Sequence, residues 1–186
     1  VLNRRPADPS GLIIRNYNNS TTVPLATPEY LRRHGTPLSP ADLKMHEGLL
    51  LKAYNDDTVT QQLFFGRERS EPLEWKRTFV THDQLTLKLL LLEHHGITVD
   101  LSILHIGEEI RRGIVVPLLE GWTKTPWCMC LANRREDELR SAKLRDFVLW
   151  MTATAREDSA RSANECRQII EDAYLRSKRV DLKRGS

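Results

Sequence analysis

The strongest constraint on the fold is an alternation of helices and strands between residues 81 and 131. The run THDQ at 81–84 has the pattern of a capping box with Thr81 at the N-cap position. The helix that it opens is leucine-rich on most of its circumference, so it should be largely buried, and Gly96 should end it. The alternation continues with a strand at 97–99, a helix that Asp100 can cap and that stops at Gly113, and strands at 114–119 and 127–131. This order favours an α/β fold with a largely parallel sheet.

The flanking segments predict further short elements. Strands are expected at 11–14, at 22–26, where Pro24 indicates an edge or crossing segment, and at 49–51, 62–65 and 73–80. Thr27 and Ser39, each followed by proline, should cap two short helices that end at Gly35 and Gly48. Two helices, at 137–155 and 159–175, should close the chain.

Composition narrows the class of protein. With 186 residues, 40% of them hydrophobic, the chain can form one sizeable core or two small lobes. Its apolar runs are far shorter than the roughly 20 residues that span a bilayer, and no signal segment opens the chain. Three cysteines indicate a reducing compartment rather than a disulfide scaffold. We therefore expect a soluble, cytoplasmic protein. The basic excess lies in the segment 176–186, which could contact nucleic acid or form a solvated terminus.

Motifs for catalysis and cofactor binding are absent from the sequence. It contains no G-x-G-x-x-G, no G-x-x-x-x-G-K-[ST] and no G-x-S-x-G. Cys128 and Cys130 would share one face of a strand, and His94, His95 and His105 could be drawn into a metal site with them. The C-x-C pair has no second matching pair, however, so small buried apolar groups are the favoured interpretation. We expect no cofactor, no metal and no enzymatic activity.

Three segments together resemble the effector-binding domain of LysR-type bacterial transcriptional regulators. The longest is THDQLTLKLLLLEHHGITVDLSILHIGEEIRRGIVVPLLEGW at 81–122. It has the family's capped helix, its Gly-Ile strand entry, a second helix and a strand ending near L-L-x-x-W. LATPEYLRRHGTPLSPADL at 25–43 is similar to the family's A-S-P-x-Y-L…G-x-P…P-x-D-L segment, and KLRDFV at 143–148 is similar to its closing helix. The resemblance runs from about residue 11 to 151.

The chain also departs from the family pattern. Asp100 stands where the family usually has proline, and His94-His95 replaces a pair of small residues. Nothing before Gly11 resembles the family's helix-turn-helix, its linker helix or the start of its first lobe. We therefore interpret residues 1–155 as a partial effector-binding domain, comprising mostly the second lobe, the crossover strands and the closing helix of the first. Residues 156–186 would be a C-terminal helical extension with a basic tail.

The resemblance implies a periplasmic-binding-protein-like pair of α/β lobes that hold a small effector in the cleft between them. Crossover segments containing Val23, Leu25, Thr27 and Met129 would act as the hinge. The strand ends and helix starts that would line the cleft carry Thr81, His82, Asp83, Lys52, Tyr54, Val99 and Asp100. A helix start favours an anion, so a small carboxylate with Lys52 as its counter-charge is the effector hypothesis. Asp83 and Asp100 argue against an acid, and Thr81 and Asp83 could be plain caps.

Partners follow from the same resemblance. The family implies a homodimer or tetramer that reaches DNA only through a helix-turn-helix domain not present in this chain, with no membrane partner. The helix at 159–175 could extend the dimer contact or pack on its own lobe. Two other functions stay open: a solute-binding protein of a transport system with the same two-lobe architecture, and a catalytic α/β domain. The sequence upstream of Val1 would discriminate, since a helix-turn-helix supports regulation and a signal peptide supports transport.

Overall fold

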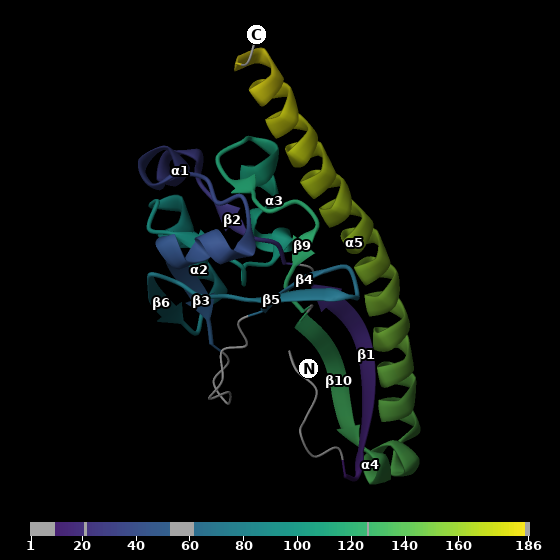
Figure 1. The fold of residues 1–186 in the computed structure, drawn as a ribbon. Helices are drawn as coiled ribbons and strands as arrows, with labels where there is room; N and C mark the ends of the chain where they lie inside the picture. The colour runs from purple at the N-terminus through teal and green to yellow at the C-terminus, as the bar shows by residue number, and fades with distance from the viewer. Residues whose placement is uncertain (1–9, 21, 53–61, 126, 185–186) are drawn as a thin grey trace. The chain divides into compact units, whose positions relative to one another are not determined.

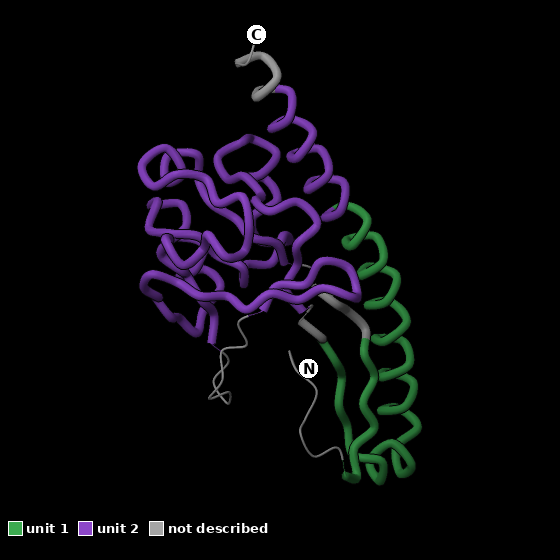
Figure 2. The backbone as a smooth tube through the Cα atoms, viewed as in Figure 1, with its two compact units in different colours: residues 1–20, 126–165 green, residues 21–125, 166–186 purple. Residues whose placement is uncertain are grey.

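The computed structural model describes residues 10–20, 22–52, 62–125 and 127–184. The chain divides into two compact units (Figure 2): residues 1–20 and 126–165 form unit 1, and residues 21–125 and 166–186 form unit 2. The predicted boundary between residues 155 and 156 falls inside one continuous helix, α5 (Ala142–Arg184). Among the described residues, no helix is both long and apolar enough to cross a membrane.

Unit 2 is built around a five-stranded sheet with the order β6-β3-β7-β2-β8. Three of these strands, β2, β3 and β6, are labelled in Figure 1. The strands are β2 (Leu25–Ala26), β3 (Glu47–Leu51), β6 (Arg77–Thr81), β7 (Ile97–Thr98) and β8 (Val116–Pro117). Strand β3 is parallel to β6 and β7, whereas β2 is antiparallel to both of its neighbours. The α/β class is therefore confirmed, but the sheet is mixed. Because β3, β6 and β7 run in one direction, their carboxyl ends share one edge of the sheet.

The remaining elements of unit 2 surround this sheet. They are α1 (Pro28–His34), the 3₁₀ helix η1 (Pro40–Met45), α2 (Gln84–Leu92), α3 (Ile103–Arg111), and a small sheet of β4 (Gln62–Phe65), β5 (Arg69–Pro72) and β9 (Trp122–Thr123). Successive residues of β3 enter opposite layers: Leu49 packs in a cluster with Leu87 of α2 and Ile106 of α3, and Leu50 in a cluster with Tyr30 of α1. The core thus has one layer on each face of the sheet.

The last part of α5 completes the first of these layers. Cys166, Ile169 and Ala173 are buried in the cluster that contains Ile106 and Ile110 of α3. Polar contacts hold the same segment in place: the Tyr174 hydroxyl donates to the Leu118 carbonyl at 2.9 Å, the Arg176 guanidinium donates to carbonyls at the end of α3, and Lys178 pairs with Glu120. From Cys166 onward the segment therefore packs on unit 2, as one of the two alternatives predicts, and a dimer contact of this helix stays a prediction.

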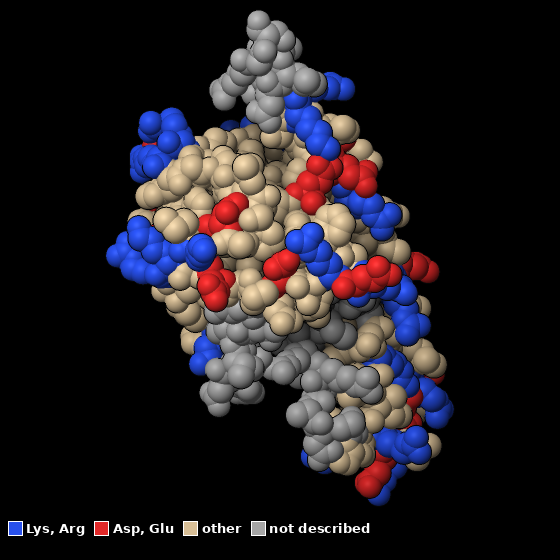
Figure 3. Space-filling model, viewed as in Figure 1, with Lys and Arg blue, Asp and Glu red and all other residues tan. Residues whose placement is uncertain are grey.

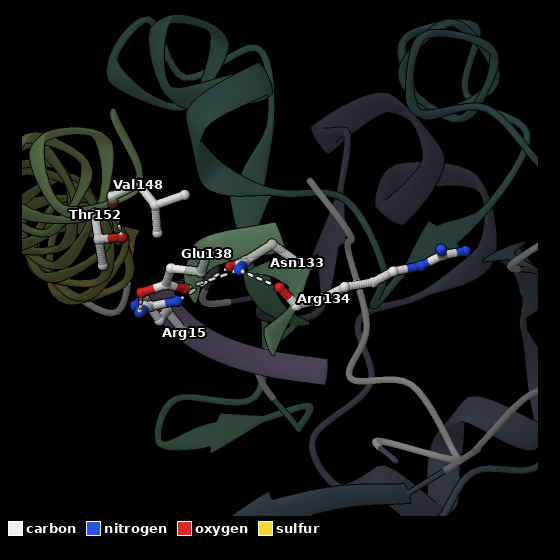
Figure 4. A network of polar contacts seen from close by, with 6 residues as sticks. All are labelled: Arg15, Asn133, Arg134, Glu138, Val148 and Thr152. Carbon is white, nitrogen blue, oxygen red and sulfur yellow. Dashed lines mark hydrogen bonds and ion pairs between the residues drawn. The ribbon is translucent and has the colours of Figure 1, made fainter. Parts of the chain in front are cut away.

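The described part of unit 1 contains two long strands, one short helix and the first part of α5. β1 (Leu12–Ser20) pairs antiparallel with β10 (Trp127–Arg134), and α4 (Arg135–Arg140) leads into the first half of α5. Figure 4 shows how side chains from three elements converge: Arg15 of β1 donates to Asn133 of β10 at 3.1 Å and pairs with Glu138 of α4 at 2.6 Å. The Arg15 guanidinium is the main reason that the pKa of Glu138 is lowered. This ion pair fastens α4 to the strand pair.

Several local predictions are confirmed. Thr27 caps α1 through its side chain, and Gly35 ends α1 with a positive φ of 86°. Gly113, also at positive φ, follows α3. Ser39 begins η1 as a capping box with Asp42. The predicted strands at 49–51 and 62–65 correspond to β3 and β4. Each of these signals depends on residues close together in the chain.

Other local predictions are wrong, because contacts distant in sequence decide them. Gly48 does not end a helix but lies in β3, where a Cβ would stand 2.5 Å from Cδ2 of Trp75. Gly96 does not end α2. The helix ends at Leu92, and the chain turns away from it at His94, which has a positive φ of 63°. A Cβ on Gly96 would meet the Glu47 carbonyl oxygen at 2.5 Å. Both glycines are therefore required for close packing rather than for helix termination.

Other element assignments also change. Asp83, not Thr81, is the N-cap of α2, and Ser102, not Asp100, is the N-cap of α3. The segment 73–75 is not a strand, and β2 is flanked by strands on both sides rather than lying at an edge. The two helices predicted at 137–155 and 159–175 are replaced by α4 and the 43-residue α5. On α2, Leu85 and Leu89 are exposed by 64% and 62%, so the helix is only half buried.

Candidate functional site

The parallel strands of unit 2 bring several of the predicted site residues to one edge of the sheet. Lys52 follows β3 and Thr81 ends β6, and the Lys52 amide donates to the Thr81 carbonyl at 2.8 Å. Nδ1 of His82 donates to the Lys52 carbonyl oxygen, also at 2.8 Å. These hydrogen bonds join the two strand ends beyond the last pair of the ladder, Leu51 and Thr81. The carboxyl edge is therefore an ordered surface built from adjacent strands.

Helix α2 begins at this edge. Oδ2 of Asp83 accepts hydrogen bonds from the Thr86 amide and the Thr86 hydroxyl, both at 2.7 Å. The Thr81 hydroxyl accepts from the Asp83 amide at 3.3 Å. The Thr86 side chain and amide lower the pKa of Asp83, so the carboxylate is held ionised at the positive end of the helix. The Thr81 hydroxyl thus stabilises the turn before α2, and the Asp83 carboxylate caps the helix itself.

Asp100 links the strands to the helix from a fully buried position. It has no exposed surface, and its Oδ2 accepts from the amide of Leu51, the last residue of β3, at 2.9 Å. Its Oδ1 is paired with Nζ of Lys124, which is itself 8% exposed. The Gln84 side-chain amide donates to the Asp100 carbonyl at 3.0 Å and accepts from the Ser102 amide at 3.3 Å. A buried carboxylate is destabilising unless hydrogen bonds and an opposite charge compensate it, and these contacts of Asp100 provide both.

Gln84 and Lys124 are the two residues of this edge that sequence reasoning missed. Gln84 was assigned to a capping box, whereas its amide bridges the start of α2 to the segment after β7. Lys124 lies 24 residues from Asp100 in the chain, and no local pattern indicates the pairing.

The other predicted site residues are placed as follows. Val99 is buried in the core cluster of Tyr30 and Leu50, so only its backbone can reach the edge. Tyr54 lies outside the described residues. Among the predicted hinge residues, Val23, Leu25 and Thr27 are buried in unit 2, where Leu25 pairs with Thr98 and Pro117. Met129 belongs to β10 of unit 1, opposite Asn18.

The histidines and cysteines are dispersed. Nδ1 of His94 lies 2.8 Å from the Thr27 hydroxyl, whereas Cys130 and Cys166 are buried in different units. Within the described residues, no group of three or more His, Cys, Asp or Glu side chains is arranged to hold a metal ion. The side chain of Cys128 is outside the described part of the structure.

Comparison with known proteins points to one family. A family model for the LysR substrate binding domain matches residues 1–156. The regulatory domain of AphB from Vibrio vulnificus is 21% identical, with a TM-score of 0.59 over 80% of this chain and 71% of that one. CrgA, a LysR-type transcriptional regulator from Neisseria meningitidis, is 26% identical, with a TM-score of 0.62 over 81% of this chain and 50% of that one. The chain spans 44% of the full-length Vibrio cholerae virulence activator AphB. No curated protein sequence matches significantly.

Proposed function

The chain belongs to the LysR substrate-binding domain family, and from this membership we propose that it senses a small-molecule effector at the carboxyl edge of β3, β6 and β7. The observation that supports this placement is the convergence of Lys52, Thr81, His82 and the start of α2 on one edge. Ligands of open α/β sheets bind beyond the carboxyl ends of parallel strands, where helix N-termini provide free amides.

We propose a small carboxylate as the effector. Lys52 supplies a positive charge and the start of α2 supplies a positive dipole end. The objection that Asp100 would repel an acid is weakened, because its carboxylate has no exposed surface and is paired with Lys124. The Asp83 carboxylate accepts two hydrogen bonds from Thr86, which compensate part of its charge. Among the described residues at these strand ends, Lys52 supplies a cationic side chain that an anion could meet.

Calorimetric titration with acetate, succinate and benzoate, with glucose and putrescine as neutral and cationic comparisons, tests this effector class. We expect one or more acids to bind and Lys52→Met to weaken that binding about tenfold, the equivalent of one charge-assisted hydrogen bond. Lys44→Met, which removes an exposed lysine of η1, is the matched control and should leave the affinity unchanged. Binding of glucose or putrescine with no heat from any acid would contradict the proposal.

The regulatory role concerns the whole protein. We propose that effector binding shifts a conformational equilibrium that controls DNA binding through a helix-turn-helix domain outside this chain, in the cytoplasm. On the face seen in Figure 3, basic and acidic side chains are interspersed along α5, which is not the pattern of a DNA-binding stripe. Arg161 and Asp158 form one ion pair on this helix. The transport alternative is not favoured, because the matching structures are transcriptional regulators.

We also propose that the chain self-associates, with a second copy covering the apolar face of β6 and α2. Phe79 of β6, an edge strand, pairs with Leu49, which packs in the layer of α2, and is about half exposed; Leu85 and Leu89 of α2 are more exposed still. Edge strands and exposed leucines on one face are typical of contact surfaces. Sedimentation should show Leu89→Lys shifting the chain toward the monomer, with Leu175→Lys on α5, also exposed, as control. An unchanged mass for both variants would contradict this surface.

A further inference from the structure

The Asp100–Lys124 pair joins the proposed effector edge to the segments through which the chain passes to unit 1. The chain crosses between units after Ser20, after Thr125 and, within α5, after Glu165. Lys124 stands just before the second crossing, and its amide donates to the carbonyl of Thr22, just after the first, at 3.3 Å. Lys124 therefore contacts the first two crossing segments through its backbone and Asp100 through its side chain.

Asp100 in turn contacts the carboxyl edge of the sheet, where the effector site is proposed. Its second carboxylate oxygen holds the Leu51 amide at the end of β3, and its carbonyl accepts from Gln84 at the start of α2. Both ends of the pair are buried, so neither side chain can contact a ligand in bulk solvent. In a buried ion pair each charge depends on the other for compensation, so the two positions cannot move independently at low cost.

We infer that the Asp100–Lys124 pair is a positioning device that couples the carboxyl edge to the crossing segments at Thr22 and Lys124. The inference rests on the proposed function for its biological meaning but not for its test. A change at the start of α2 is transmitted through the Asp100 carbonyl and carboxylate to Lys124, and from there to its hydrogen bond with Thr22. The energetic link works in both directions, as linkage requires.

Amide hydrogen exchange without any ligand tests this coupling in a double-mutant cycle. Gln84→Leu removes the hydrogen bond to the Asp100 carbonyl, and we expect it to speed exchange of the Lys124 amide about fivefold, the equivalent of one hydrogen bond. In the Lys124→Met background the same change should alter exchange at residue 124 by less than about twofold. The Leu87 amide, which donates to Asp83 within α2, reports the local effect in every chain.

Lys88→Met is the matched control background. It breaks a partly buried pair with Glu109 between α2 and α3 that does not involve the crossing segments, so the response of Lys124 to Gln84→Leu should persist. If Lys124→Met does not fold, Asp100→Asn replaces it, since it removes the charge and keeps an oxygen for the Leu51 amide.

An equal response to Gln84→Leu with and without the pair, or a response confined to Leu87, would overturn the inference and leave the pair a purely structural contact. Because no ligand is used, the failure of every acid in calorimetry would not affect this result. Conversely, loss of coupling in the exchange cycle would leave the proposed effector function standing.

Discussion

The carboxylate of Asp100 accepts a hydrogen bond from the Leu51 amide at 2.9 Å, across the carboxyl ends of the adjacent parallel strands β3 and β7. The side chain of Asp100, which follows β7, therefore forms a hydrogen bond with the sheet and is not exposed to solvent. The other carboxylate oxygen of Asp100 forms an ion pair with the ammonium of Lys124. This arrangement makes Asp100 a structural anchor of the edge on which the proposed effector site is built.

Breaking this pair should be costly. We expect Asp100→Asn and Lys124→Met each to lower the free energy of unfolding by about 3 kcal/mol, because each leaves one buried group without its partner. The double variant should lose less than the sum of the two, since it leaves no uncompensated charge. Urea unfolding followed by circular dichroism measures all three. Strict additivity would show that the two side chains do not stabilise each other.

Packing at Gly48 gives a second prediction. A Cβ at this position would stand 2.5 Å from Trp75, so Gly48→Ala should lower the unfolding free energy by about 1–3 kcal/mol. Combining it with Trp75→Leu should recover part of that loss relative to Trp75→Leu alone, because the smaller side chain makes room for the methyl group. If the cost of Gly48→Ala is the same in both backgrounds, contact with Trp75 is not its cause.

The pH dependence of stability should contain a contribution from His46. Burial is the main reason that the pKa of His46 lies below its ordinary value of 6.5, and its Nδ1 is 3.3 Å from the Tyr30 hydroxyl. The unfolded chain then binds the proton more tightly than the folded one. Stability is therefore fully present above pH 6.5 and decreases as the pH falls below it, toward the lower folded-state pKa.

Chemical unfolding between pH 7.5 and about 5 measures this contribution. His46→Gln should flatten the decrease, whereas His105→Gln, at an exposed position of α3, should leave it as in the unaltered chain. A decrease of the same slope in the His46 variant would assign the effect to other groups.

The C-terminal half of α5 should stabilise unit 2. Ile169 is buried against α3, where a Cβ on Gly107 would lie 3.1 Å from its Cδ1. Ile169→Ala should cost about 2–4 kcal/mol in unfolding free energy. Leu175→Ala, on the exposed face of the same helix, should change it by no more than about 0.5 kcal/mol. Equal effects would mean that the helix does not pack on α3 in solution.

The sequence was informative where a signal is local and silent where the partner is distant. The Thr27 cap and the Gly35 terminus of α1 were predicted because both depend on residues within one or two turns. Gly48 and Gly96 were misassigned, since the atoms that exclude a side chain there belong to Trp75 and to Glu47. Propensity rules cannot identify such contacts.

In the candidate site too, some features could be predicted from the sequence and others depend on contacts distant in the chain. The order of strands and helices predicted that Lys52, Thr81 and His82 would lie near one edge, and their hydrogen bonds show that they do. The role of Asp100 could not be predicted, because it depends on Lys124, which reaches Asp100 only in the folded chain. A capping residue and a buried ion-pair partner have the same appearance in sequence.

The most direct test of the central claim is an NMR titration of the isotope-labelled chain with acetate, succinate and benzoate. We predict saturable shifts concentrated at the amides of Lys52, Thr81–Gln84 and Leu101–Ser102, and their loss in the Lys52→Met variant. If a binding acid instead shifts amides elsewhere and leaves these unmoved, the carboxyl edge of β3, β6 and β7 is not the effector site.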